Sequence, residues 1–169
     1  MANTFELIYS ATVGSGGAAD ITFNTIPSTF TDLCLVLSSR TASGGAADVL
    51  IQFNTDSTAG NYSQKQIQAN GATVSGGTGN QQSATSSGST DTASTFANSQ
   101  IYIPNYAGAT TKNYNTDSVT ENNATTAYAT LRAGRWNDTS AINAIKLTHN
   151  GGANFAQYST AYLYGVKNA

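Results

Sequence analysis

Short runs in which apolar and polar residues alternate recur along the whole chain. The clearest is TFELIYSATV at the start, where every second residue from Phe5 to Val13 is apolar. Such a period of two is typical of a half-buried β-strand. Nine further runs follow: DITFN, DLCLVLSSR, DVLIQFN, NYSQKQIQAN, SQIYIPNY, NYNTDSVTE, AYATLRAGRW, AINAIKLTHN and QYSTAYLYGV. With turn residues between them, they predict an all-β sandwich or barrel of about eight to ten antiparallel strands.

The length of 169 residues suits one well-buried domain covering 1–169. Charged residues make up only 9% of the chain, against about 25% in an ordinary soluble domain. The net charge of −2 and the nine Tyr, six Phe and one Trp argue against disorder. The sequence therefore predicts a folded domain with a neutral surface of hydroxyls and amides.

The hexapeptide SGGAAD occurs twice, at 15–20 and 43–48. A solenoid needs three or more copies at a fixed period, so we interpret the two copies as similar hairpin loops of one sandwich. Asn150-Gly151 is the strongest hairpin signal, because both residues accept the positive φ of a type I′ turn, and Asn70-Gly71 is a weaker one.

The segment Gly71–Thr95 is almost purely small and polar and is predicted to be a long Gly/Ser/Thr-rich loop. Long loops without structure are usually functional or disordered. Two interpretations stay open: a floppy linker, or an extended arm that orders against a neighbouring subunit.

Several classes of partner are disfavoured by composition. The seven basic residues are spread singly and form no nucleic-acid footprint. No apolar run approaches the roughly 20 residues of a membrane helix, and the first residues lack the features of a secretion signal. We therefore expect no nucleic-acid partner, no membrane partner, and synthesis in the cytosol.

Candidate catalytic groups are few. The single histidine, His149, lies beside a turn and is expected to be a solvated or capping side chain. The single cysteine, Cys34, lies among leucines and is expected to be a buried small hydrophobe. Asp117 and Glu121 share one strand face, but strand rise places them roughly 13 Å apart, too far for a glycosidase pair.

The remaining aspartates considered lie at strand edges, where they serve as turn formers; they are Asp20, Asp32, Asp48 and Asp56. The glycine-rich stretches lack the Gly-Lys-Ser/Thr ending of a phosphate loop. We predict no catalytic, cofactor-binding or metal-binding residues, no cofactor and no enzymatic activity.

Aromatic residues gather in the second half of the chain, where they could stack on sugar faces or pack in the core or a subunit interface. Tyr162 and Tyr164 are two residues apart and so share one strand face, which favours packing in the core or a subunit interface. The set considered is Tyr102, Tyr106, Tyr114, Trp136, Tyr158, Tyr162 and Tyr164.

Several longer phrases, taken together, resemble a known group of proteins. They are FELIYSATVGSGGAADITFNTIPSTFTDLCLVLSSR, IQFNTDSTAGNYS, IYIPNYAGATTKNYNTDSVTENNATTAYATLRAGRWNDTSAINAIKLT and YSTAYLYGVKNA. The chain is similar here to small virion structural proteins of tailed phages, many from viruses of aquatic bacteria including cyanobacteria. The most specific parts are Ile26–Arg40, Ile101–Gly108 and the Tyr-Leu-Tyr-Gly ending, and none of them is a catalytic motif.

The resemblance implies a jelly-roll-like sandwich that assembles as a small oligomer, often a homotrimer. It implies a capsid decoration (cement) protein on the outer surface of the virion, bound to the major capsid protein at symmetric sites and stabilising the shell. The alternative is a tail or fibre component that recognises the host surface, including glycans. A fibre tip usually follows a long shaft of heptads or repeats, which this sequence lacks, so decoration is the favoured interpretation.

Overall fold

The computed structural model describes residues 4–121 and 127–167, and these form an all-β sandwich, as predicted. The described residues contain twelve strands and one short 3₁₀ helix, η1 (Ala59–Asn61). The strands are β1 (Phe5–Thr12), β2 (Asp20–Phe23), β3 (Asp32–Ser39), β4 (Ala47–Phe53), β5 (Tyr62–Asn70), β6 (Thr73–Gly79), β7 (Gln82–Ser86), β8 (Ala97–Ile103), β9 (Lys112–Glu121), β10 (Ala127–Trp136), β11 (Ile145–His149) and β12 (Thr160–Val166).

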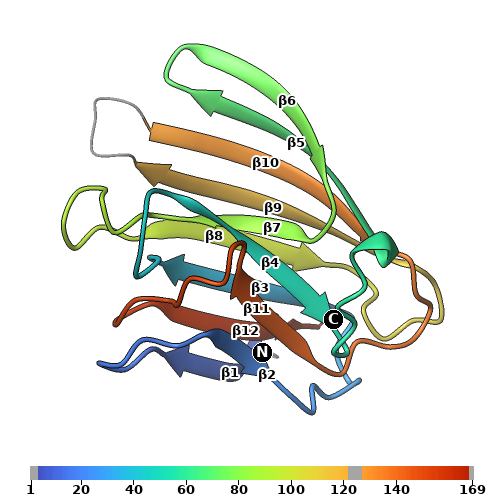
Figure 1. Ribbon diagram of the computed structural model, residues 1–169. Helices are drawn as coiled ribbons and strands as arrows, with labels where there is room; N and C mark the ends of the chain where they lie inside the picture. Colours follow the sequence, from blue (N-terminus) through green and yellow to red (C-terminus); the bar gives the residue numbers. More distant parts are fainter. Residues whose placement is uncertain (1–3, 122–126, 168–169) are drawn as a thin grey trace.

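Two antiparallel sheets of unequal width build the sandwich (Figure 1). The larger sheet has the strand order β1-β12-β3-β8-β9-β10-β5-β6, and the smaller has the order β2-β11-β4-β7. All ten alternating runs of the sequence are strands. The finer expectation of a jelly roll stays a prediction.

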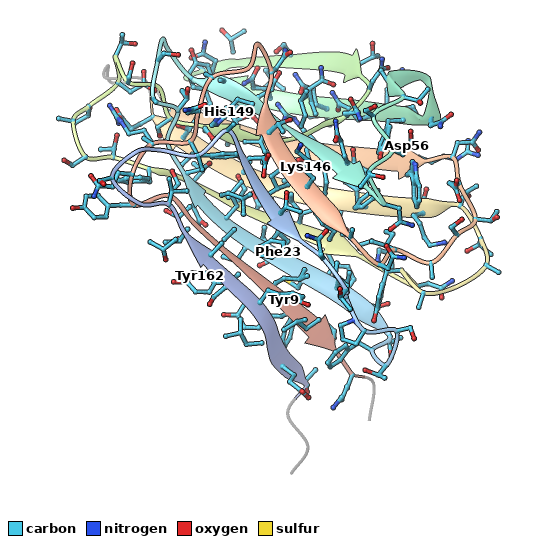
Figure 2. All side chains as sticks on the ribbon, turned by 60° about the horizontal axis from the view of Figure 1, so that its bottom comes forward. Tyr9, Phe23, Asp56, Lys146, His149 and Tyr162 are labelled. Atoms are coloured by element: carbon cyan, nitrogen blue, oxygen red, sulfur yellow. The ribbon has the colours of Figure 1, made fainter. Side chains whose placement is uncertain are left out.

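The hydrophobic core lies between β3, β8 and β12 of the larger sheet and the facing strands of the smaller one. The alternation of side chains along each strand builds this core, because Leu33, Leu35 and Leu37 all point inward from β3 and are fully buried. At the edge of the core, Tyr9 of β1 stacks on Phe23 of β2 with ring centroids 5.9 Å apart (Figure 2). Other core members are Ile21, Val49, Ile51, Phe53, Ile101, Ile103, Ile145, Leu147, Phe155 and Leu163.

Both SGGAAD copies carry the chain from one sheet to the other, so the expected hairpins are wrong. The first copy joins β1 of the larger sheet to β2 of the smaller, and the second joins β3 to β4 in the same direction. The two copies also differ in conformation. Positive φ falls on the third residue of the first copy, Gly17, but on the second residue of the other, Gly44. Equal sequence therefore does not mean equal structure here.

The segment Gly71–Thr95 is not the long loop or extended arm that its composition predicted. It supplies β6 and β7, the two strands that the alternating pattern missed. Asn70 pairs with Thr73 across the two-residue loop Gly71–Ala72, and Gly71 has a φ of 57°. The weaker Asn-Gly signal thus marks a true hairpin.

The stronger signal, Asn150-Gly151, does not mark a hairpin, because β11 and the next strand, β12, belong to different sheets. Gly152 N–H donates to His149 O at 3.1 Å across this turn. Gly151 has a φ of 83°, whereas Asn150 stays out of the left-handed region. This is the pattern of a type II turn and not of type I′.

The larger sheet extends beyond the smaller one at the β10-β5-β6 end (Figure 1). There the inner face changes from apolar to polar along the strands. Trp136 and Tyr62 form a buried aromatic pair at one end of β10 and β5. Arg132, four residues before Trp136 on β10, lies opposite Gln66 of β5. The overhang thus leaves polar groups facing the edge of the smaller sheet.

Candidate binding surfaces

His149 and Cys34, the two side chains best suited to act as a base or a nucleophile, are both buried. His149 is 2% exposed, so the expectation of a solvated side chain is wrong, whereas its bond to Ala153 O in the following turn fits the alternative of a capping side chain. Burial lowers the pKa of its imidazole below the usual 6.5. Cys34 is buried as predicted, and desolvation raises the pKa of its thiol.

His149 belongs to a chain of hydrogen bonds that runs between the sheets. Its Nδ1 lies 3.1 Å from Ala153 O, which can only accept, so Nδ1 carries the proton of the neutral ring. Nε2 then accepts from Ser86 Oγ at 2.7 Å, and Ser86 Oγ accepts from Ser39 Oγ at 2.6 Å. A serine hydroxyl on a histidine is a nucleophile–base arrangement. Here Ser86 and Ser39 are fully buried and meet no solvent, so the chain of bonds joins strands.

The aspartates at strand edges do form turns and also hold distant segments together. Asp56 accepts from Thr58 N at 2.9 Å, as a turn former does, and from Trp136 Nε1 at 2.8 Å. Asp32 accepts from Tyr102 Oη at 2.5 Å, which raises the pKa of Tyr102 to about 12. Asp20 lies 3.4 Å from Lys146. Asp48 forms an ion pair, described below.

Asp117 and Glu121 lie on β9 and share its outer face, as the spacing predicted. Glu121 accepts bonds from the Thr92 and Thr95 hydroxyls. Within the described ranges, His, Cys, Asp and Glu nowhere gather in a group of three that could hold a metal ion.

The aromatic residues divide between the core and the outer face. Trp136, Tyr106 and Tyr114 are buried, with Trp136 only 1% exposed, so they cannot stack on a sugar. Tyr162 and Tyr164 are half-buried on the outer face of β12, not in the core; Figure 2 labels Tyr162. Tyr164 and Tyr102 flank Cys34 on this face. Tyr158 is exposed.

An apolar patch covers the outer face of the larger sheet over β9, β10, β5 and β6. The strand registers place its residues in two adjoining rows: Leu131 lies opposite Ile67, while Ala129 lies opposite both Val119 and Ala69. The large members are 46–67% exposed. We call this set the outer patch: Val119, Ala129, Leu131, Ile67, Ala69 and Val74.

A hollow of about 410 Å³ continues the outer patch toward the other end of the same strands. Ala133 lines it together with two cations, Lys65 and Arg135. An apolar centre with a polar margin is the usual anatomy of a protein–protein interface.

The outer patch ends at β6, which is an open edge of the larger sheet. Edge strands are commonly protected by charges, proline or a bulge. The opposite edge, β1, has a register shift between Leu7 and Tyr9 and an ion pair of Glu6 with Lys167 at 2.7 Å. β6, TVSGGTG, has regular register, no charge and no proline. Its edge is therefore available for pairing with another strand.

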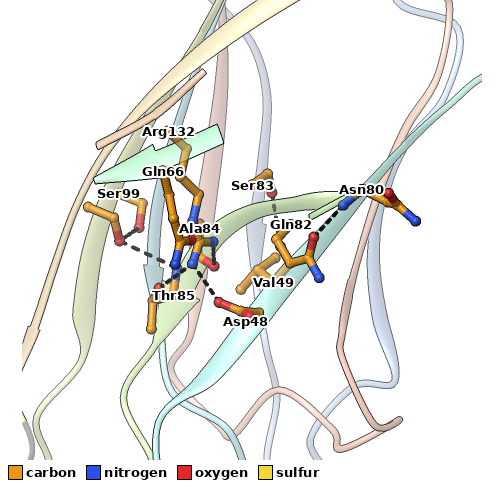
Figure 3. A network of polar contacts seen from close by, with 11 residues as sticks. Asp48, Val49, Gln66, Asn80, Gln82, Ser83, Ala84, Thr85, Ser99 and Arg132 are labelled. Atoms are coloured by element: carbon orange, nitrogen blue, oxygen red, sulfur yellow. Dashed lines mark hydrogen bonds and ion pairs between the residues drawn. The ribbon is translucent and has the colours of Figure 1, made fainter. Parts of the chain in front are cut away.

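A polar cleft lined by Arg132 lies on the inner side of the overhang, and Figure 3 shows the polar contacts of Arg132. Arg132 Nη2 lies 2.5 Å from Asp48 Oδ1 and 3.2 Å from Thr85 Oγ1. Nη1 donates to Ala84 O at 2.6 Å, and Nε donates to Gln66 Oε1 at 3.0 Å. The guanidinium thereby joins β10 and β5 of the larger sheet to β4 and β7 of the smaller one.

Sequence reasoning missed both the outer patch and this cleft. A signal for the cleft was present, because Arg132 alternates in phase with Trp136 in AYATLRAGRW and so must face inward with it. A charged residue on an inward face needs a partner. Asp48 lies 84 residues away in sequence, so the pairing itself depends on the fold.

Comparison with family models, curated proteins and solved structures found no match. Across the described ranges, no helix has the length and apolar character needed to cross a membrane.

Proposed function

We propose that this chain is a structural protein of a phage virion, a capsid decoration (cement) protein that binds the major capsid protein at symmetric sites and stabilises the shell. It would lie on the outer surface of the capsid as a homotrimer with a jelly-roll-like fold. The observation that carries the proposal is the outer patch, which adjoins the unprotected edge of β6.

The outer patch has the chemistry of a docking surface. Four large apolar side chains lie exposed on adjacent strands, and their burial against a partner would be favourable at about 25 cal/mol per Å². Charges are sparse on the two rows of the patch. Asp117, which pairs with Leu131, is the one ionised residue among those described in these rows. Few charges then need to be desolvated on docking.

The edge of β6 adds a second mode of attachment. Free backbone groups of an edge strand can pair with an extended segment of a partner, and main-chain hydrogen bonds supply the affinity. Many copies on a symmetric shell make weak individual contacts sufficient, because each attachment raises the effective concentration of the next. A decoration protein needs nothing more than such a surface.

The test is rebinding of the purified chain to capsids that lack it, measured by co-sedimentation and by the melting temperature of the capsid. Ile67→Asp places a charge at the centre of the outer patch and is expected to abolish binding. Leu7→Asp is the matched control, because Leu7 is also an exposed aliphatic residue but lies on β1 at the opposite edge. Undiminished binding by Ile67→Asp would refute the docking surface.

A tail or fibre component that recognises the host surface is the second candidate. It is favoured by the half-buried tyrosines Tyr102, Tyr162 and Tyr164 on the outer face of β8 and β12. The number of copies per virion separates the two candidates, since a shell protein is present in hundreds of copies and a tail protein in a handful.

A further inference from the structure

We propose that the cleft around Arg132 binds one ring of a neutral saccharide. The cleft lies where β10 and β5 overhang the edge of the smaller sheet and has a volume of about 240 Å³. Residues of four strands and of the loop before β4 line it: Ala46, Asp48, Gln66, Gln68, Thr85, Tyr128 and Arg132.

Arg132 holds the residues that line the cleft in fixed positions. Its side chain is 2% exposed and bonds to Asp48, Thr85, Ala84 and Gln66, so it holds groups from both sheets in fixed positions (Figure 3). A site whose polar groups are already ordered loses little conformational entropy when a ligand binds. Arg132 is therefore a positioning residue, with its own hydrogen bonds directed at protein atoms.

Hydrogen-bonding groups remain for a ligand after these bonds are counted. Asp48 bonds Arg132 through Oδ1, and Gln66 accepts through Oε1, which turns its Nε2 donor away from Arg132. Among the described residues, Asp48 Oδ2, Gln66 Nε2 and the Gln68 amide have no partner. One carboxylate acceptor and two amides can bond the neighbouring hydroxyls of a sugar, which both donate and accept. Tyr128 is the one aromatic residue among the described residues that line the cleft.

Gly77 of β6 contributes to the same arrangement. It lies opposite Gln66, and a Cβ added there would come within 3.0 Å of Gln66 Nε2 and 3.1 Å of its Cγ. The absence of a side chain at Gly77 thus lets the Gln66 amide lie against β6. An alanine would force the Gln66 side chain to shift by a few tenths of an ångström.

Charge and size select the class of ligand. Among the described residues that line the cleft, Asp48 and Arg132 alone are ionised, and they neutralise each other, so this lining offers no free cation to a phosphate or sulfate. The lining is mainly polar, which disfavours an apolar ligand. The volume equals about eight waters at about 30 Å³ each and lies below the roughly 300 Å³ of a drug-sized pocket. One sugar ring fits these limits.

The inference does not depend on the proposed shell-binding function. The cleft uses the inner face of β10 and β5, whereas the outer patch uses the opposite face of the same strands. Either proposal can fail while the other stands.

The test is an NMR titration of the full, ¹⁵N-labelled chain with D-glucose, D-galactose, D-mannose and N-acetylglucosamine, and with sodium phosphate as the charged probe. We expect at least one sugar to bind with a millimolar Kd, because few hydrogen bonds form. The shifted amides should be those of Gln66, Gln68 and Thr85. No shift with any sugar, shifts confined to the outer face, or equal binding of phosphate would overturn the proposal.

Two variants sharpen the test. Gln68→Ala removes an amide that bonds no described residue and should weaken sugar binding about tenfold. Gly77→Ala should weaken it less, because the added Cβ shifts the Gln66 amide by a few tenths of an ångström. Gln100→Ala is the matched control, because Gln100 is an exposed amide on the outer face of β8, and it should bind as the unmodified chain does. With melting temperatures unchanged, equal affinity of Gln68→Ala and Gln100→Ala would refute the assignment.

Discussion

Lowering the pH from 7 to 5 is expected to destabilise the folded chain through His149. This residue is the only histidine in the sequence, and burial lowers its pKa below the usual 6.5. The unfolded chain therefore binds a proton as the pH falls through about 6.5, while the folded chain does not yet bind one. Stability is complete above this pH and is lost below it, because protonation favours the unfolded state.

The magnitude follows from the difference in proton binding. Each pH unit between the two pKa values costs at most about 1.4 kcal/mol of unfolding free energy. At pH 5, about 1.5 units below the unfolded pKa, the loss reaches at most about 2 kcal/mol. For a domain of this size that lowers Tm by about 4–8 °C. Protonation is also opposed by geometry, since Nε2 accepts from Ser86 and would have to donate instead.

Thermal unfolding followed by circular dichroism between pH 7 and 5 measures this effect. His149→Gln is the comparison variant, because the glutamine amide can still donate and accept hydrogen bonds but does not titrate in this range. The variant should be less stable at pH 7 and show a flatter dependence on pH. Asp56 and Asp138 stay ionised in the folded chain across this range. Burial raises the pKa of Asp56, but its hydrogen bonds outweigh burial and lower that pKa below 3.8; hydrogen bonds with Ser140 lower the pKa of Asp138. Equal pH slopes in the two proteins would refute the reasoning.

Three further predictions concern residues of the core and its rim. Trp136→Ala should lower the unfolding free energy by about 3–5 kcal/mol in chemical denaturation, whereas Trp136→Phe, which loses chiefly the bond to Asp56, should cost less. Lys112→Met should cost about 1–3 kcal/mol in the same assay, because the buried Nζ donates to three backbone carbonyls that would lose their donor. The Tyr102 hydroxyl should titrate near pH 12 by NMR, and Asp32→Asn should move its pKa back toward 10, since the carboxylate raises it.

The sequence was sufficient to predict ten strands, those in which side chains alternate between two unlike faces. It failed at β6 and β7 for a physical reason. β6 is mostly exposed on both faces, and β7 is buried among polar partners, with Ser86 bonded to His149. Neither environment selects alternating apolar residues, so a hydrophobic pattern carries no signal there.

Turn chemistry was a weaker guide than strand pattern. A glycine-rich stretch marks where the chain bends, but the sheet that the next strand joins depends on packing far away in sequence. Both SGGAAD copies illustrate this, because each leads from the larger sheet to the smaller. The same limit applies to the cleft, where alternation places Arg132 inward but only the fold brings Asp48 to it.

The two proposed surfaces share β10 and β5, and side-chain alternation separates them. Leu131 and Ile67 point to the outer face, whereas Arg132 and Gln66, their immediate neighbours in sequence, point inward. A substitution on one face should therefore leave the other function intact: Ile67→Asp should lose capsid binding and keep the sugar-induced shifts, and Gln68→Ala should do the reverse. If either single substitution removed both activities, the cause would be a change in the shared β5–β6 hairpin, and the separation of the two surfaces would be wrong.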